Sequence, residues 1–129
     1  MTRAATAEAA DPMGVTRAFC EAINRAELER ACVCFTRTAC LVTPDGTAVH
    51  GREAIAGILA QLIAARVEVS IDVAAVLKAG DVALAHQRWR IRSGGSGEGF
   101  ETSARPTLVL RRLESRWKLA VAAPWGWGE

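Results

Sequence analysis

Features that would point to a nucleic acid or a membrane are missing from this 129-residue chain. Its 16 basic residues are nearly balanced by 14 acidic ones, and a net charge of +2 gives no sign of a nucleic-acid-binding surface. No apolar run reaches the roughly 18 residues that a membrane span needs. We therefore expect no nucleic acid and no membrane as partners.

The first ten residues, Met1–Ala10, are rich in alanine and lack the apolar core of a signal peptide. We expect residues 1–11 to form a flexible N-terminal tail. Residues 12–129 are expected to form a single domain, because half of the chain is hydrophobic and can build one core. Without a secretion signal, the expected location is the cytoplasm.

Metal-ligating residues are few and poorly spaced. The chain has two histidines and four cysteines, which are Cys20, Cys32, Cys34 and Cys40. One residue between Cys32 and Cys34 is not a zinc spacing, and the histidines lie far along the chain. We predict reduced thiols that are buried as small hydrophobic residues, with no metal and no cofactor.

The first half of the chain has helical patterns. Asp11 and Pro12 suit an N-cap and a first helical position, and the helix should reach about Asn24. A short second helix is expected over residues 27–35. A third helix opens at Arg52, with an apolar stripe at helical spacing: Ile55, Ile58, Leu59, Leu62 and Ile63.

Strand patterns follow. A first pair, 39–43 and 48–50, is joined by Pro44-Asp45-Gly46, which favours a tight turn. From Val67 the apolar period becomes two, with one face predicted to carry Val67, Val69, Ile71, Val73, Ala75 and Leu77. Further strands are expected over 82–92, 101–113 with a break at Pro106, and 116–123, with a flexible loop over 93–99. Helices first and long consecutive strands last predict an α+β fold.

Two stretches carry a family resemblance. The first is Pro44-Asp45-Gly46 followed by Val49-His50-Gly51-Arg52-Glu53-Ala54-Ile55; the second includes Ser115-Arg116-Trp117-Lys118-Leu119 and Pro124-Trp125-Gly126. The chain resembles the nuclear-transport-factor-2-like superfamily in its SnoaL-like and ketosteroid-isomerase-like branch. The resemblance implies three helices packed in a strongly curved, cone-shaped antiparallel sheet, which is a cystatin-like fold. It also implies a pocket inside and a homodimer through the outer sheet face.

The catalytic groups that the resemblance implies are absent from their positions. In ketosteroid-isomerase-like members a carboxylate moves the proton, while a tyrosine and a neutral acid hold the oxyanion. These positions fall on Thr43, Phe19 and near Leu108, and an aspartate common in SnoaL-like relatives falls on Ala122. The chain contains no tyrosine at all. Mechanisms that depend on a tyrosine are therefore excluded.

The remaining polar candidates are His86 and Arg88, which alternate along one strand. By resemblance their face lines the pocket, which would make His86 the one candidate general base. Alternatively, His86 is structural or lies at the dimer interface. Residues expected to bind a ligand are Phe19, Thr43, Leu59, His86, Arg88, Leu108 and Trp125.

Three functions follow from this pattern. The first is a homodimeric SnoaL-like domain whose apolar pocket, roughly 300–1,000 Å³ in volume, binds a hydrophobic ring-bearing or carbonyl-bearing metabolite. The second is an isomerase, cyclase or dehydratase that uses His86 as general base, with Arg88 or Thr43 on the developing oxyanion. The third is a non-catalytic protein-interaction module, for which a polar cone filled by side chains is expected.

Overall fold

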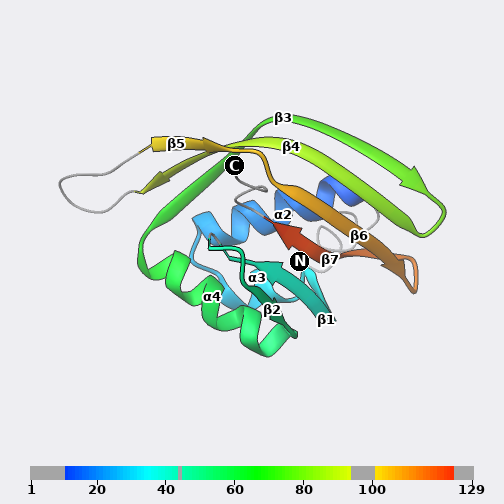
Figure 1. The fold of residues 1–129 in the computed structure, drawn as a ribbon, viewed down its shortest axis with the longest axis horizontal. Helices are drawn as coiled ribbons and strands as arrows, with labels where there is room; N and C mark the ends of the chain where they lie inside the picture. Colours follow the sequence, from blue (N-terminus) through cyan, green and yellow to red (C-terminus); the bar gives the residue numbers. More distant parts are fainter. Residues whose placement is uncertain (1–10, 44, 94–100, 124–129) are drawn as a thin grey trace.

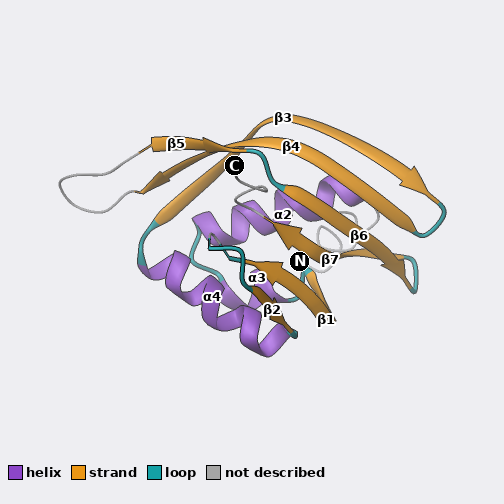
Figure 2. Ribbon diagram, in the orientation of Figure 1, coloured by secondary structure: helices purple, strands orange, loops and turns teal. Residues whose placement is uncertain are grey.

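The three helices of the described residues lie against one side of a curved sheet (Figures 1 and 2). The computed structural model describes residues 11–43, 45–93 and 101–123. The expected N-terminal tail before Asp11, the loop after Ser93 and the predicted site residue Trp125 lie outside these residues. The predicted α+β class and the curved sheet are confirmed.

Both long helices begin where the sequence predicts, and α2 also ends at its predicted residue. Helix α2 spans Pro12–Asn24, with Asp11 at the N-cap position and proline in the first turn. Helix α4 spans Arg52–Ala64 after Gly51, whose φ of 93° suits a residue without a side chain. Each has 13 residues, and no described helix is long and apolar enough to cross a membrane.

The second helix is shorter than predicted. Helix α3 spans only Leu28–Cys32, and strand β1 already begins at Phe35 and runs to Val42. Phe35 is fully buried as a strand residue and packs edge-on against Phe19 of α2, with ring centroids 5.5 Å apart. Its apolar side chain fits a strand as well as a helix, so a short pattern did not separate the two. Strand β2, Ala48–His50, matches its predicted bounds.

The sheet has the strand order β2-β1-β7-β6-β4-β3, with β5 added beside β4. The remaining strands are β3 (Val67–Ala79), β4 (Val82–Ser93), β5 (Glu101–Ala104), β6 (Thr107–Leu113) and β7 (Arg116–Ala123). Pro106 separates β5 from β6, as the sequence predicts. All pairs are antiparallel except one: β1 lies parallel to β7, with Leu41 opposite Ala122.

Strand β3 contains a bulge that the alternating pattern did not predict. Ile71 pairs with Trp89 and Val73 pairs with Arg88, so Asp72 is an extra residue with no residue of β4 opposite it in the ladder. The side chains beyond it therefore change faces. Val76 packs against the core, whereas Leu77 is 67% exposed. The prediction of one continuous apolar face from Val67 to Leu77 is wrong for this reason.

Candidate functional site

The space between α2, α4 and the inner sheet face is lined by apolar side chains. They come from α2, β1, α4, β3 and β4, and they are Phe19, Ile23, Leu41, Ile58, Leu59, Leu62, Val67, Val69, Trp89 and Ile91. The rings of Phe19 and Trp89 in this wall lie 6.4 Å apart. The remaining cavity is about 20 Å³. It has room for about one water molecule, so the expected pocket of several hundred Å³ is wrong for this structure.

The orientation of β4 reverses the main prediction about the site. Ala83, Ala85, Gln87, Trp89 and Ile91 are buried, whereas His86, Arg88 and Arg90 are exposed. The prediction that the His86 face lines the interior is wrong. Burying the Arg88 face would bring three guanidinium groups out of water, while burying the other face covers a tryptophan and an isoleucine. Arg88 instead pairs with Asp72, with Nε and Oδ2 3.3 Å apart on the outer face.

The other predicted site residues do not form one site. Phe19, Leu59 and Leu108 are at most 4% exposed and belong to the core. Thr43 stands at the end of β1, where its hydroxyl contacts Asp45 of the turn and its backbone N–H donates to Thr47. Thr43 therefore has a local structural role. Whether any of these residues binds a ligand stays a prediction.

Two buried polar side chains lie next to each other on the inner face of β4, and sequence reasoning did not select them. The indole N–H of Trp89 donates to the side-chain oxygen of Gln87, with the two atoms 2.5 Å apart. The amide nitrogen of Gln87 in turn lies 3.7 Å from the sulfur of Met13. A glutamine between Ala85 and Trp89, on the apolar side of an alternating strand, was the signal that could have found this pair.

Ionisable groups are placed outside the interior. Every described Asp and Glu is exposed except Glu21, which is half-buried and pairs with Arg25 and Arg30. Both histidines are exposed. No group of three or more potential metal-ligating residues occurs within residues 11–43, 45–93 and 101–123. The described interior thus offers no general acid or base.

Two of the thiols, Cys20 and Cys32, are not activated. None of the four cysteines forms a disulfide. Burial, with a smaller effect of Cys34, raises the pKa of Cys20 to about 12, and burial also raises the pKa of Cys32. A thiol that stays protonated is a poor nucleophile, so neither residue is suited to nucleophilic catalysis.

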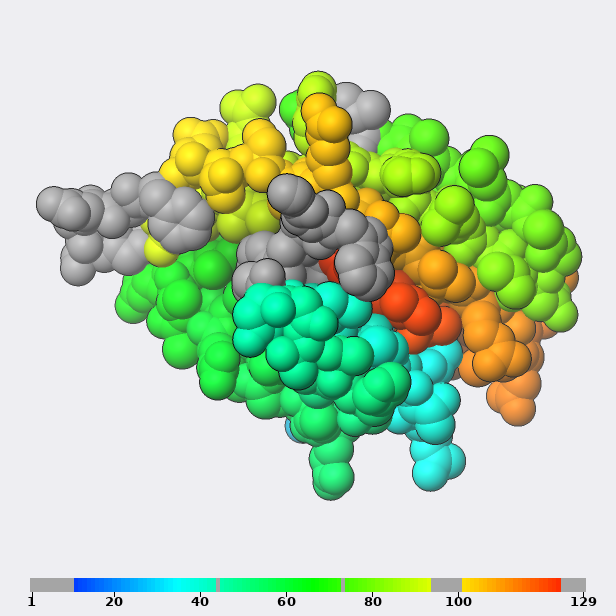
Figure 3. Space-filling view, in the orientation of Figure 1, coloured from blue at the N-terminus to red at the C-terminus, as the bar shows by residue number. Residues whose placement is uncertain are grey.

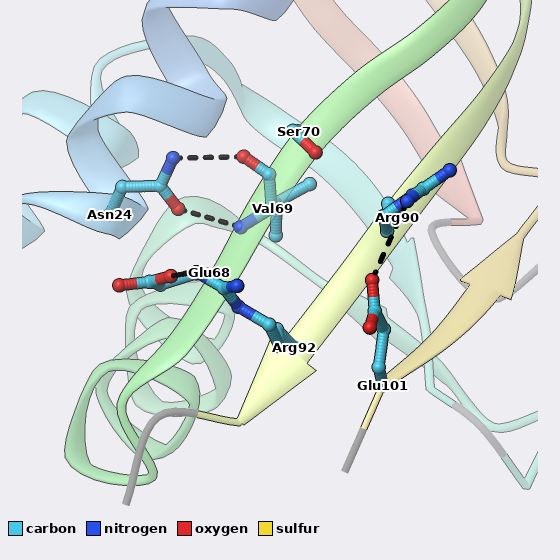
Figure 4. Close-up of a pocket in the computed structure, with 7 residues that line it drawn as sticks. All are labelled: Asn24, Glu68, Val69, Ser70, Arg90, Arg92 and Glu101. Carbon is cyan, nitrogen blue, oxygen red and sulfur yellow. Dashed lines mark hydrogen bonds and ion pairs between the residues drawn. The ribbon is translucent and has the colours of Figure 1, made fainter. Parts of the chain in front are cut away.

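A surface hollow of about 260 Å³ lies where α2 meets the edge strand β3 (Figure 4). The side-chain amide of Asn24 donates to the backbone oxygen of Val69 at 2.8 Å and accepts from its N–H at 2.7 Å. Charged groups on the other side of the hollow neutralise each other. Arg92 pairs with Glu68 at 2.6 Å, and Arg90 lies 3.7 Å from Glu101.

A larger groove, of about 520 Å³, lies between the C-terminal ends of α2 and α4. Its walls are Ile23, Asn24, Arg25, Ala26, Ile63, Ala64, Arg66, Val67 and Glu68. Two of them, Ile23 and Val67, also line the interior cavity. The groove is therefore the surface depression that adjoins the apolar interior at this end of the molecule.

The outer sheet face carries an apolar row across four strands. Cross-strand pairs place Leu77 beside Leu84, Leu84 beside Val109, and Val109 beside Val121. We call these four residues the outer row. In Figure 3 the β3–β4 and β6–β7 hairpins, which carry it, form one continuous part of the surface at the right of the view. Leu77 at 67% exposure is the most exposed large hydrophobic residue of the described chain.

Comparison with known proteins decides the family. A model of the SnoaL-like domain matches residues 16–118, which include every described helix and strand at least in part. The chain belongs to the SnoaL-like family. No curated protein matches it.

Solved structures of other proteins share the fold of this SnoaL-like chain. A candidate dehydratase of the nuclear-transport-factor-2-like family from Streptomyces avermitilis is 25% identical, with a TM-score of 0.75 over 85% of this chain and 90% of that one. A protein of unknown function from Mycobacterium tuberculosis has a TM-score of 0.78 at 18% identity, over 86% and 70% of the two chains. A Nostoc punctiforme protein of unknown function with a cystatin-like fold has a TM-score of 0.75 at 14% identity, over 86% and 84%.

The structure also places the positions that catalytic members of the branch use. In this SnoaL-like chain Leu108 pairs with Ala122 across β6 and β7, and Leu41 pairs with Ala122 across β1 and β7. Phe19 is buried against Phe35. Three of the four positions that the resemblance implied for catalysis, Phe19, Leu108 and Ala122, are thus buried in the core, while Thr43 is half-buried and hydrogen-bonded within the turn after β1.

Proposed function

We propose that this SnoaL-like chain is a non-catalytic binding domain that takes a small, mostly apolar molecule between α2, α4 and the inner sheet face. The apolar composition of the inner wall supports this proposal most directly. Ten apolar residues line the cavity, and the buried polar residues of the described chain are Thr16, Thr36 and Gln87, none of which is ionisable. Such a wall favours an apolar ligand and gives it no proton-transfer partner.

An enzyme of the isomerase, cyclase or dehydratase type is supported less well. Elimination or isomerisation needs a base within hydrogen-bonding reach of the substrate. His86, the candidate base, is on the outer face together with Arg88 and Asp72. The candidate dehydratase assignment of the Streptomyces avermitilis protein therefore does not extend to this chain through His86.

Binding requires the interior to open, because its cavity of about 20 Å³ holds no ring. Helix α4 is the wall best placed to move. Its first half is anchored by the fully buried Ile55 and Leu59, whereas Leu62 and Ile63 near its end are only half-buried. A small outward shift of this end would enlarge the cavity without uncovering the anchored half.

The proposal is tested with N-phenyl-1-naphthylamine, a neutral apolar probe whose fluorescence rises in apolar surroundings. We expect saturable binding to the purified protein. Ile58→Trp should abolish it by filling the cavity that Ile58 lines. Val33→Trp is the matched control, because Val33 is 51% exposed and outside the cavity wall. No saturable binding, or equal binding by both variants, would reject the interior site.

A second proposed function is self-association through the outer row, as the family resemblance implies. The observation that favours it is the row of Leu77, Leu84, Val109 and Val121, which is more apolar than a solvated sheet face requires. On the β3–β4 side of the row, Arg88, Arg90 and Arg92 are paired with Glu68, Asp72 and Glu101. Sedimentation velocity should show a dimer, and a monomer at high protein concentration would contradict it.

A further inference from the structure

The groove between the C-terminal ends of α2 and α4 extends the interior site to the surface. Ile23 and Val67 line both the cavity and the groove, and Asn24 and Glu68 line both the groove and the hollow of Figure 4. The interior cavity is almost closed, whereas the groove has about 520 Å³. A ligand longer than the cavity would therefore extend between Ile23 and Val67 and leave its other end in the groove.

One positive charge in this groove has no opposite charge beside it in the described chain. Arg25 pairs with Glu21 at 3.2 Å, and Glu68 pairs with Arg92 at 2.6 Å. Arg66 lines the same groove, is exposed, and makes no side-chain hydrogen bond or ion pair with the described residues. The charged side chains of the groove therefore leave an excess of one guanidinium group.

A simpler role for Arg66 would be to neutralise the partial negative charge at the end of α4. Several terminal carbonyl groups of the two helices already have partners. Backbone N–H groups donate to the oxygens of Ala22 and Ile23 in α2 and of Ile63 in α4, and the Ser93 hydroxyl donates to the oxygen of Ala65. These hydrogen bonds reduce the need for a guanidinium group at the helix end. Arg66 is then available to an outside anion.

We propose that the ligand is an amphipathic carboxylate, with its apolar body in the interior and its carboxylate in the groove at Arg66. This inference rests on the proposed function and specifies its ligand class. A guanidinium group is suited to a carboxylate because its N–H groups match the two oxygens. The apolar walls Ile23, Ile63 and Val67 lie between this charge and the cavity, so the ligand needs an apolar segment next to its carboxylate.

Two probes of equal size separate the contributions of charge and apolar surface. 1-Naphthaleneacetate and 2-(1-naphthyl)ethanol share a ring and a chain length and differ in the carboxylate. Each is titrated against the protein loaded with N-phenyl-1-naphthylamine, and displacement gives its affinity. We expect the carboxylate to bind about tenfold more tightly than the alcohol, as one charge-assisted hydrogen bond would give.

The variants locate the source of that preference. Arg66→Ala and Arg66→Gly should bring the two affinities together while the alcohol binds as before, and Arg66→Lys should keep most of the preference. Arg66→Gly guards against a folding defect, because the φ of Arg66 is 57°, a conformation that glycine adopts more readily. Arg37→Ala is the control, since Arg37 is exposed beside the other end of α4 and should leave both affinities unchanged.

Each outcome bears on one of the two proposals. Equal affinities in the wild type, or a preference that survives in Arg66→Ala, would reject the carboxylate site and leave the apolar binding domain intact. If N-phenyl-1-naphthylamine does not bind the wild type at all, the proposed function fails and this inference fails with it. Loss of the preference in Arg37→Ala as well would show a general charge effect and would also reject the site.

Discussion

The inner and outer faces of β4 carry neighbouring side chains with different roles. Trp89, 2% exposed, packs toward Phe19 and donates a hydrogen bond to Gln87, while Arg88 and Arg90 on either side of it extend into solvent and pair with Asp72. The inner face stabilises the fold through burial. The outer face carries charges that contribute little to stability and remain available for contacts with another molecule.

The largest expected effect compares a residue from each face. Trp89→Ala should lower the free energy of unfolding by about 3–5 kcal/mol, because it leaves a cavity at the centre of the core. His86→Ala, on the outer face, should change it by no more than about 0.5 kcal/mol. Urea titration of both variants checks the pair. A large effect of His86→Ala would mean that its side chain has buried partners, and the assignment of the two faces would be wrong.

The next test uses the change of face beyond the bulge at Asp72. Val76→Asp should destabilise the fold by about 2 kcal/mol or more, because it brings a carboxylate against the core. Leu77→Asp should leave the monomer's stability within about 0.5 kcal/mol of wild type and weaken self-association through the outer row. Thermal denaturation and sedimentation velocity measure the two effects. The reverse ranking of stabilities would show that no bulge is present.

A smaller effect is expected inside the core. Gln87→Leu should cost about 1.5 kcal/mol, because the indole N–H of Trp89 then lacks its acceptor. In the Trp89→Phe background the same substitution should cost less, since no donor remains to be left unpaired. A double-mutant cycle in urea gives this coupling, and additive costs would show that the hydrogen bond contributes nothing to stability.

The smallest effect is expected on the outer face. Glu68→Gln removes the ion pair with Arg92, whose side chains are 51% and 62% exposed, and should change the stability by less than about 0.5 kcal/mol. A clearly larger loss in low-salt urea titrations, reduced at high salt, would mean that the outer charges act as a network. The two faces of β4 would then differ less in their contributions to stability than we expect.

Local signals in the sequence explain which elements were predictable. The starts of α4, β2 and β7 follow from glycine at Gly51, the turn at Asp45–Gly46 and the turn at Glu114–Ser115, each of which interrupts regular structure by its own backbone preference. The bulge at Asp72 has no such signal. One extra residue in an alternating strand gives no recognisable sequence signal. It nevertheless shifts the inward–outward alternation of the side chains after it.

The candidate site was harder to predict than the fold. The pattern favoured His86 because histidine is chemically versatile, but the burial of β4 is decided by Trp89 and Ile91 on its other face. Gly51 and Pro106 indicate element boundaries through local backbone preferences. The groove at Arg66 depends instead on two helices ending side by side. That arrangement is a tertiary property, and periodicity within one segment does not contain it.

The parallel pairing of β1 with β7 has a consequence for synthesis and folding. Leu41 finds its neighbour Ala122 only after nearly all of the described chain has been made, and β1 otherwise pairs only with the three-residue β2. Contacts between such distant segments form slowly because a long loop must close first. We expect the first strand to stay incompletely protected while translation proceeds, so that nascent chains shortened before Arg116 remain protease-sensitive.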